Sequence, residues 1–219
     1  TRHAQVGWIG IAEKNPERAK YVAEQLKADF VTSDYRELLN RPEVNAAIIS
    51  TDEHLHVDPI LAAVERKHSL MIEKPLATDL GDSARVLKAI QASGVDAVVG
   101  YTQRFRRRWL AAKEKVSTGQ LGDVTLVSSR AFMNRLVAID NYKRTTHPER
   151  ISPMVISGTH ALDIVMWMMQ CKTPVEVYAR AIDKALGPEY KGIDATSGVV
   201  TFSDGTIYQA TISWALPVV

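Results

Sequence analysis

The chain has 219 residues, of which 46% are hydrophobic and 24% are charged, and its formal net charge is +2. This composition is typical of a soluble globular protein, and the near-neutral charge excludes a strong general attraction to nucleic acid or to a membrane surface. No apolar stretch approaches the roughly 20 residues that a membrane-spanning helix needs. The single cysteine, Cys171, excludes an internal disulfide, and residues 1–10 carry no basic-then-apolar leader, so we expect a cytoplasmic protein.

The first half of the chain alternates between predicted strands and predicted helices. Apolar runs predict strands at residues 6–12, 46–50, 69–72 and 95–99. The run at residues 46–50 does not alternate with polar residues, which favours a strand covered on both faces. Because parallel strands joined by short helical crossovers form an open sheet, this order predicts a nucleotide-binding layout.

Between these strands, the sequence predicts helices. Asn15 suits a helix cap and Pro16 a first turn, and an apolar stripe continues to Leu26. Residues 33–34 open a second short helix, and residues 59–67 form a third. A fourth helix ends at Gly94, and its expected apolar positions are Leu80, Ala84, Leu87 and Ile90.

The pattern changes after about residue 104, where we expect a second domain to begin. Residues 105–117 predict a helix that ends at Gly119. In residues 124–132, apolar and polar side chains alternate as in a strand with one solvent-exposed face, and no crossover helix is expected directly after them. Residues 158–169 predict an apolar helix, and the segments 175–182 and 197–214, with a turn at residues 203–205, predict sheet with a hairpin.

A dinucleotide-binding fold should begin with a strand, a glycine-rich turn and a helix that hold the pyrophosphate. Gly7 and Gly10 lie in the first apolar run, and nothing like G-x-G-x-x-G follows them. Either the fold is a different one or the chain is shortened at its N-terminal end, and we favour shortening.

The tripeptide Glu73-Lys74-Pro75 directly follows the predicted strand at residues 69–72. Ligands of open α/β sheets collect outside the carboxyl ends of the strands, so Lys74 stands where a proton can be exchanged with a substrate hydroxyl. A lone lysine is more often a solvated surface charge, and the tripeptide alone does not decide between these interpretations.

The order of six motifs resembles the glucose-fructose oxidoreductase and inositol dehydrogenase (Gfo/Idh/MocA) family of two-domain NAD(P)-dependent enzymes. The motifs are residues 11–19, Ile49-Ser50-Thr51 with His54 and His56, Glu73-Lys74-Pro75-Leu76, Gly100-Tyr101 with Arg104-Phe105, residues 119–122, and Gly158-Thr159-His160-Ala161-Leu162-Asp163. The resemblance implies a Rossmann-type doubly wound parallel sheet, without its first strand and Gly-rich loop, in a dinucleotide-binding domain at residues 1–104. It implies an α+β substrate and oligomerisation domain at residues 105–219, with a large open, mainly antiparallel sheet that is incomplete at its C-terminal end.

The resemblance also implies a coenzyme, NAD, with NADP possible. A carboxylate such as Glu13, at the end of a strand, can accept hydrogen bonds from the ribose hydroxyls and repel a 2′-phosphate, whereas Lys14 could pair with a phosphate. The other residues expected at the coenzyme are Ser50, Thr51, His56 and Glu73. The pair His54-x-His56 could instead suggest a metal, but the acids and Cys171 show no ligand-type spacing, so we expect no metal site.

The same resemblance places Lys74 and His160 at the reacting hydroxyl as the catalytic pair, and Tyr101, Arg104 and Asp163 near the substrate. A salt bridge at the domain junction would explain Arg104 equally well. Many relatives carry an aspartate four residues before the histidine, where this chain has Ile156, which puts the full proton relay in doubt. Asp163 follows His160 by three residues, but spacing alone does not make it a replacement.

These features predict an oxidoreductase that moves hydride between nicotinamide and a secondary alcohol of a sugar, polyol or cyclitol. Ile156 favours the alternative of a non-catalytic dinucleotide-binding sensor, and different chemistry on the same fold, such as an NAD-assisted glycosidase or an imine or enone reductase, is a third reading. The basic run at residues 104–108 beside Trp109 invites a nucleic-acid interpretation, but Glu114 interrupts it and we expect no nucleic-acid partner. A homodimer or homotetramer is expected from the sheet-rich second domain.

Overall fold

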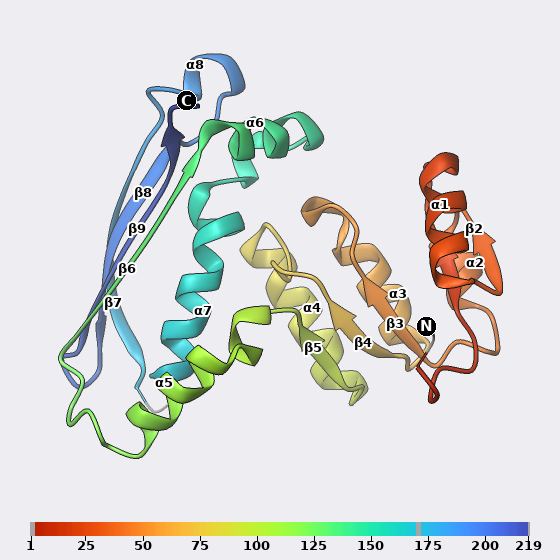
Figure 1. Ribbon diagram of the computed structural model, residues 1–219, viewed down its shortest axis with the longest axis horizontal. Helices are drawn as coiled ribbons and strands as arrows, with labels where there is room; N and C mark the ends of the chain where they lie inside the picture. The colour runs from red at the N-terminus through yellow and green to blue at the C-terminus, as the bar shows by residue number, and fades with distance from the viewer. Residues whose placement is uncertain (1–2, 170–171, 219) are drawn as a thin grey trace. The chain divides into compact units, whose positions relative to one another are not determined.

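The computed structural model describes residues 3–169 and 172–218, and Cys171 lies outside the described residues. The chain divides into two compact units, which meet in sequence between Gly100 and Tyr101. In Figure 1 the first unit runs from red to yellow-green and the second from green to blue. Each unit is described by itself.

The first unit is built from short parallel strands that alternate with helices (Figure 1). Its elements are β1 (Gly10–Ala12), α1 (Pro16–Leu26), β2 (Phe30–Thr32), α2 (Tyr35–Leu39), β3 (Ala46–Ile49), α3 (Val57–Glu65), β4 (Ser69–Ile72), α4 (Leu80–Ser93) and β5 (Ala97–Val99). Strands β1 and β2 pair with each other, and β3, β4 and β5 form a second group with β4 in the centre. Every pairing in this unit is parallel, which confirms the predicted α/β class.

Residues that the sequence predicts to begin or end helices do so in the structure. The side chain of Asn15 accepts a hydrogen bond from the Arg18 amide at 3.0 Å, and Asp34 accepts one from the Arg36 amide at 2.8 Å, so both helices begin with a satisfied cap. Gly94 ends α4 with a φ of 72°, a left-handed conformation that glycine adopts without a steric penalty.

Other expectations for the first unit are wrong. The first strand covers only Gly10–Ala12, because the Ile9 amide is held by the Asp29 carboxylate at 2.8 Å instead of a neighbouring strand. Strand β2 was not predicted. On β3, Ile48 is 72% exposed, so this strand is not covered on both faces by the described residues.

The expected apolar face of α4 is also wrong in part. Leu80 is 86% exposed and Leu87 is 51% exposed, whereas Val86, which the helical spacing had left out, is fully buried. Ala89 and Ile90 pack beside Val86 against the core of the unit. Helices α2, α3 and α4 and strands β3 and β4 contribute to that core, and its fully buried members are Ile60, Ala63, Ile72 and Val86.

The second unit contains a four-stranded sheet with helices beside it, as Figure 1 shows. Its elements are α5 (Arg107–Ser117), β6 (Leu126–Asn134), α6 (Arg135–Arg144), α7 (Thr159–Met168), β7 (Pro174–Ile182), α8 (Gly187–Tyr190), β8 (Ala195–Phe202) and β9 (Ile207–Leu216). The strand order is β6-β9-β8-β7. Strands β7, β8 and β9 pair antiparallel and β6 pairs parallel with β9, which confirms a mainly antiparallel sheet.

Two local features of this unit differ from the expectation. Helix α6 directly follows β6, where no helix was predicted. The apolar helix α7 is preceded by one turn of π-helix, Met154–Gly158, a rare form that is frequent at functional sites. Gly158 permits the close approach of this turn to the sheet, because an added Cβ would lie 2.8 Å from Cγ1 of Ile212.

The turn between β8 and β9 is held by an ion pair. Asp204 contacts the Lys172 ammonium and accepts a hydrogen bond from the Thr206 amide at 3.1 Å. The hydrogen bond from Lys172, followed by that from the Thr206 amide, lowers the pKa of Asp204 from 3.8 to about 2. A carboxyl whose pKa is lower in the folded state stabilises the fold above its unfolded pKa and loses that contribution as the pH falls through the folded pKa.

We therefore expect Asp204→Asn to lower the thermal midpoint at pH 6, and the difference from the wild type to vanish as the pH falls from about 4 to about 2. Thermal unfolding followed by circular dichroism at a series of pH values measures this. In a Lys172→Met background the same substitution should have a smaller effect. A difference between wild type and Asp204→Asn that is constant across this range would contradict the assignment.

Candidate functional site

Lys74 leaves the carboxyl end of β4, the central strand of its group, as the sequence predicts. The ends of β3 and β5 lie on either side, because the pairs Ile49–Ile72 and Ile72–Val99 are in register. Ser50 and Thr51 follow β3 and are exposed, and Lys74 itself is half-buried. The first unit thus brings Ser50, Thr51 and Lys74 to one edge of the sheet.

The carboxylate of Glu73 fixes the backbone at this strand exit. Its Oε2 accepts a hydrogen bond from the Lys74 amide at 3.0 Å, while the Glu73 amide donates to the Ile49 carbonyl at 2.8 Å. The Gly100 amide donates to the Ile72 carbonyl at 2.7 Å, and a Cβ on Gly100 would lie 3.6 Å from the other Glu73 oxygen. The tighter contact of such a Cβ would be with the Ile72 carbonyl oxygen at 3.3 Å, so a side chain at this position would crowd the backbone of β4.

His56 lies beneath the same edge. The residue is 1% exposed, and both ring nitrogens face backbone carbonyls, with Nδ1 2.8 Å from Pro75 O and Nε2 3.0 Å from Thr51 O. The Lys74-Pro75 bond is cis. A contact between this ring and a coenzyme stays a prediction.

Glu13 and Lys14 line an open hollow of about 460 Å³ on the first unit. The hollow lies between α1 and the end of β2, and its other walls include Ala19, Ala23, Thr32 and Ser33. Glu13 is half-buried, its Oε1 accepts a hydrogen bond from the Asn15 amide at 2.8 Å, and its Oε2 lies 3.5 Å from Arg18. The volume is within the range of small-ligand sites.

In the second unit, Tyr101 and His160 lie together. The Tyr101 hydroxyl is 2.9 Å from the Thr159 hydroxyl, and the Tyr101 ring meets the His160 ring edge to face at 6.2 Å between centroids. Thr159 and His160 begin α7, immediately after the π-helix. Sequence reasoning named Thr159 only as part of a motif, although a hydroxyl beside a candidate histidine is a recognisable signal.

Arg104 and Asp163 form an ion pair within the second unit. The Arg104 Nε and Nη2 atoms donate to the two Asp163 carboxylate oxygens at 2.8 and 2.5 Å, a bidentate arrangement. The Asp163 side chain is 8% exposed and that of Arg104 is 40% exposed. Both residues belong to the second unit, and Arg104 lies close to the point where the two units meet in sequence.

Ile156 has no access to a substrate from its place in the core. It is 5% exposed and packs in a cluster with Tyr142 and Trp214. The neighbouring residue, Ser157, accepts a hydrogen bond from the Trp214 indole at 2.9 Å. The position where the resemblance implies an aspartate is therefore a packing position in this chain.

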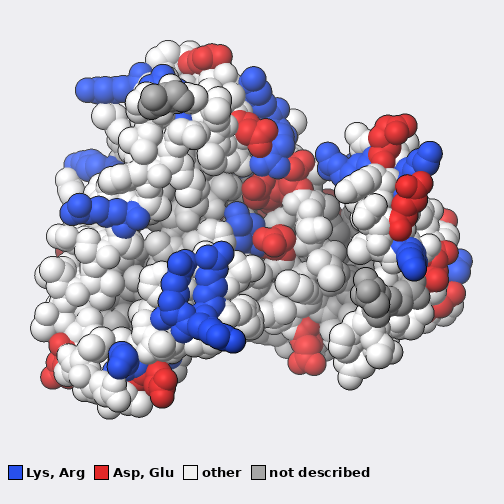
Figure 2. All heavy atoms as spheres, viewed as in Figure 1, with Lys and Arg blue, Asp and Glu red and all other residues white. Residues whose placement is uncertain are grey.

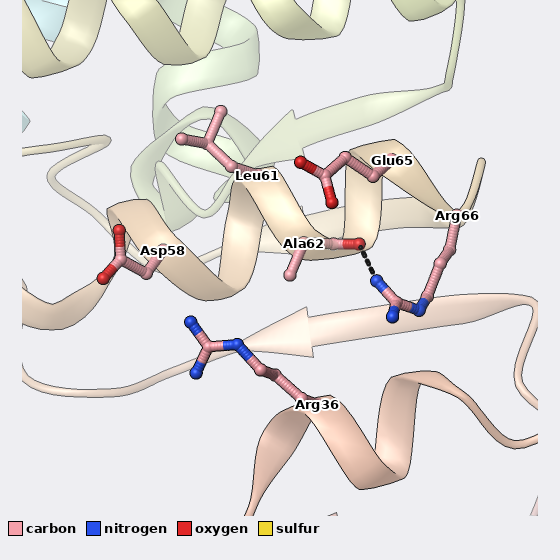
Figure 3. A pocket seen from close by; sticks show the side chains of 6 residues that line it. All are labelled: Arg36, Asp58, Leu61, Ala62, Glu65 and Arg66. Carbon is pink, nitrogen blue, oxygen red and sulfur yellow. Dashed lines mark hydrogen bonds between the residues drawn. The ribbon is translucent and has the colours of Figure 1, made fainter.

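A second hollow, of about 320 Å³, contains none of the predicted site residues. It lies between α2 and α3, and Figure 3 shows Arg36 pointing toward Asp58 while Arg66 folds back onto α3. Arg66 donates to the Ala62 carbonyl at 3.2 Å and to Asn40 Oδ1 at 2.7 Å. The hollow is lined by charged side chains of both signs, as is usual on a protein surface, so we assign no ligand to it.

The basic run at residues 106–108 is exposed. Arg108 stacks over the Trp109 ring at 5.5 Å and donates to Gln103 at 3.3 Å. On the face shown in Figure 2, basic side chains form several separate groups with acidic ones among them. Within residues 3–169 and 172–218, no group of three or more His, Cys, Asp or Glu side chains is placed to hold a metal ion, and no helix there is long and apolar enough to cross a membrane.

Both parts of the chain match models of one protein family. Residues 1–101 match the model described as "Oxidoreductase family, NAD-binding Rossmann fold", and residues 109–218 match the model of the GFO/IDH/MocA C-terminal domain. An uncharacterized oxidoreductase of Bacillus subtilis, YrbE, is 28% identical over 90% of this chain and 57% of its own length. Inositol 2-dehydrogenase of Salmonella typhimurium is 28% identical over 76% of this chain and 49% of its own length.

The chain therefore spans about half the length of these curated relatives. The crystal structure of scyllo-inositol dehydrogenase from Lactobacillus casei, with bound NAD(H) and scyllo-inositol, has the same fold, with a TM-score of 0.83 at 17% identity. That alignment covers 98% of this chain and 64% of the other.

Removing Arg104 should destabilise the second unit, because the buried Asp163 carboxylate would lose its partner. We expect Arg104→Gln to lower the free energy of unfolding by about 1–3 kcal/mol, a range reduced from that of a buried pair because Arg104 is partly exposed. Adding Asp163→Asn should recover part of the loss. Urea unfolding measures both, with Arg108→Gln as the exposed control, and equal effects of Arg104→Gln and Arg108→Gln would show that the pair is unimportant.

Proposed function

Because the chain belongs to the Gfo/Idh/MocA family of NAD-binding oxidoreductases, we propose that it transfers hydride between a nicotinamide coenzyme and a secondary alcohol of a sugar, polyol or cyclitol. The observation that carries the proposal is the position of Lys74 at the carboxyl end of the central strand β4, where its backbone is fixed by Glu73. Ligands of open α/β sheets bind at this end of the strands.

The side chains of the first unit are suited to binding NAD. Glu13 presents a half-buried carboxylate in the hollow of about 460 Å³, and such a group accepts hydrogen bonds from ribose hydroxyls and repels a 2′-phosphate. The Asn15 amide orients this carboxylate, while Arg18 lies close enough to offset part of its charge. When bound, the nicotinamide supplies the acceptor for the hydride. Ser50 and Thr51, at the exposed edge after β3, are proposed to lie on the nicotinamide side.

Lys74 is proposed to move the proton. A hydride leaves an alcohol carbon only as the hydroxyl loses its proton, so a base within hydrogen-bond reach of that hydroxyl is required. The Lys74 amine is the ionisable group at the end of β4, and the Glu73 carboxylate is engaged by the Lys74 amide. His160 is proposed to share the proton transfer from the second unit, where Tyr101 packs against its ring.

The second unit favours an uncharged, polyhydroxylated substrate. Asp163 already neutralises the Arg104 guanidinium, so this arginine is not an open site for an acidic group. The nearby groups, the Tyr101 and Thr159 hydroxyls and the His160 ring, are suited to hydrogen bonds with substrate hydroxyls. Inositol 2-dehydrogenase is the name of one relative, and a cyclitol has this chemistry.

One observation favours a second function, a sensor that binds the coenzyme without turnover. Ile156 stands where the family resemblance implies an aspartate, and its side chain is packed in the core. A sensor would bind NAD and show no substrate-dependent absorbance at 340 nm when it is screened with sugars and polyols. The enzyme would produce NADH with at least one of them.

We also propose that the protein is a cytoplasmic homodimer or homotetramer. The face of the second-unit sheet that carries alternate residues of β6 and β7 has exposed apolar side chains, including Phe132, Tyr178 and Ile182. Exposed apolar patches of this kind mark association surfaces. Light scattering of the purified protein measures the mass.

Lys74→Met should lower kcat by about 100-fold or more, because the reaction loses its base, while the Kd for NAD stays close to that of the wild type. Stopped-flow or steady-state absorbance at 340 nm measures the first quantity and fluorescence titration the second. Lys88→Met, on an exposed part of α4, is the matched control. Near-normal turnover of Lys74→Met would reject the assigned role.

Glu13→Gln should weaken NAD binding by about 10-fold, since a charged acceptor of the ribose hydroxyls is lost, and should leave NADP binding unchanged or tighter. Titration with each coenzyme measures the ratio of the two Kd values. Glu17→Gln, exposed in the first turn of α1, is the control. If both variants keep the wild-type ratio, Glu13 does not select the coenzyme.

A further inference from the structure

We propose that His56 is a positioning residue, which holds the backbone at Lys74 in the conformation that proton transfer requires. The inference rests on the proposed function for the role of Lys74, but the geometry that supports it lies wholly in the first unit. His56 is 1% exposed, and each of its ring nitrogens already has a backbone carbonyl of the protein as its neighbour.

The ring connects three segments of the chain. Its Nδ1 lies 2.8 Å from the carbonyl of Pro75, the residue after Lys74, and its Nε2 lies 3.0 Å from the carbonyl of Thr51, which follows β3. The backbone of His56 starts α3, since its carbonyl accepts a hydrogen bond from the Ile60 amide at 3.2 Å. One buried side chain at the start of α3 therefore contacts the chain just after β3 and just after β4.

Lys74 is consequently held on both sides. The Glu73 carboxylate binds the Lys74 amide at 3.0 Å, and His56 binds the carbonyl of the next residue. The Lys74 amide and the Pro75 carbonyl are thus both held by side chains of the first unit, which restrains the backbone before and after the Lys74 side chain. A displacement of about 1 Å at a reacting group can lower a rate by about 100-fold, so this restraint affects turnover.

The two contacts of the ring are not equivalent. A neutral imidazole has one N–H, and only one of two carbonyls can accept it. The shorter contact, to Pro75, is the one to which we assign the proton. An asparagine amide nitrogen can occupy roughly the place of Nδ1 and a glutamine amide nitrogen that of Nε2. His56→Asn can therefore keep the Pro75 contact, and His56→Gln the Thr51 contact.

The test compares these two variants in the purified protein. His56→Gln, which loses the Pro75 contact, should lower kcat by about 10- to 100-fold with little change in the KM for NAD. His56→Asn should keep kcat within about 3-fold of the wild type. Thermal midpoints are measured for both, because each removes a buried ring and should lose stability to a similar extent.

His68 provides the matched control. It is also a buried histidine of the first unit, at 7% exposure, and its Nε2 lies 3.0 Å from the Leu39 carbonyl. It precedes β4, at the end of that strand opposite to Lys74. His68→Asn should lower the thermal midpoint and leave kcat unchanged. A kcat loss in His68→Asn equal to that in His56→Gln, at the same stability, would overturn the proposal, as would equal kcat losses in the two His56 variants.

A second measurement separates this inference from the proposed function. A brief pulse of acetic anhydride, followed by mass spectrometry, gives the acetylation rate of Lys74 relative to that of exposed Lys88. His56→Gln should raise this ratio and His56→Asn should not, whether or not the protein oxidises any alcohol tested. If the ratio is the same in the wild type and in His56→Gln, the ring does not position Lys74, even where the dehydrogenase activity is found.

Discussion

The parallel hydrogen bonding of β3, β4 and β5 is the interaction on which the candidate site depends. Leu70 and Ile72 of the central strand are buried, so the register of β4 is fixed by its core face. A slip by one residue would turn these side chains outward and move Lys74 away from the edge that it shares with Ser50 and Thr51. Burial of the apolar side chains of β4 therefore determines where the Lys74 amine lies.

Side chains that contact the backbone outside the sheet also help to fix the position of Lys74. The Glu73 carboxylate accepts a hydrogen bond from the Lys74 amide, and the His56 ring contacts the Pro75 carbonyl. In the second unit the same principle appears in Arg104 and Asp163, where a charged side chain is engaged by another before any ligand is present. Residues that a motif presents as ligand-binding groups can therefore be the ones that hold others in place.

The sequence predicted the regular elements better than the side-chain partners. Asn15, Asp34 and Gly94 act through neighbours a few residues away, so local reasoning located the helix ends that they form. Strand β2 was missed because its apolar run, Phe30 and Val31, is only two residues long, whereas β1 and β5 lie within longer apolar runs. Leu80 and Leu87 were assigned to the buried face of α4 because helical spacing alone does not say which face meets the core.

The candidate residues were located by motif, but their interactions depend on separations that a sequence does not reveal. The bonds of His56 to Pro75 and of Arg104 to Asp163 join residues 19 and 59 positions apart.

The mutual neutralisation of Arg104 and Asp163 also bears on how a substrate would arrive. Because this pair carries no net charge, its own contribution to steering a charged ligand, and to the effect of ionic strength on the association rate, should be small.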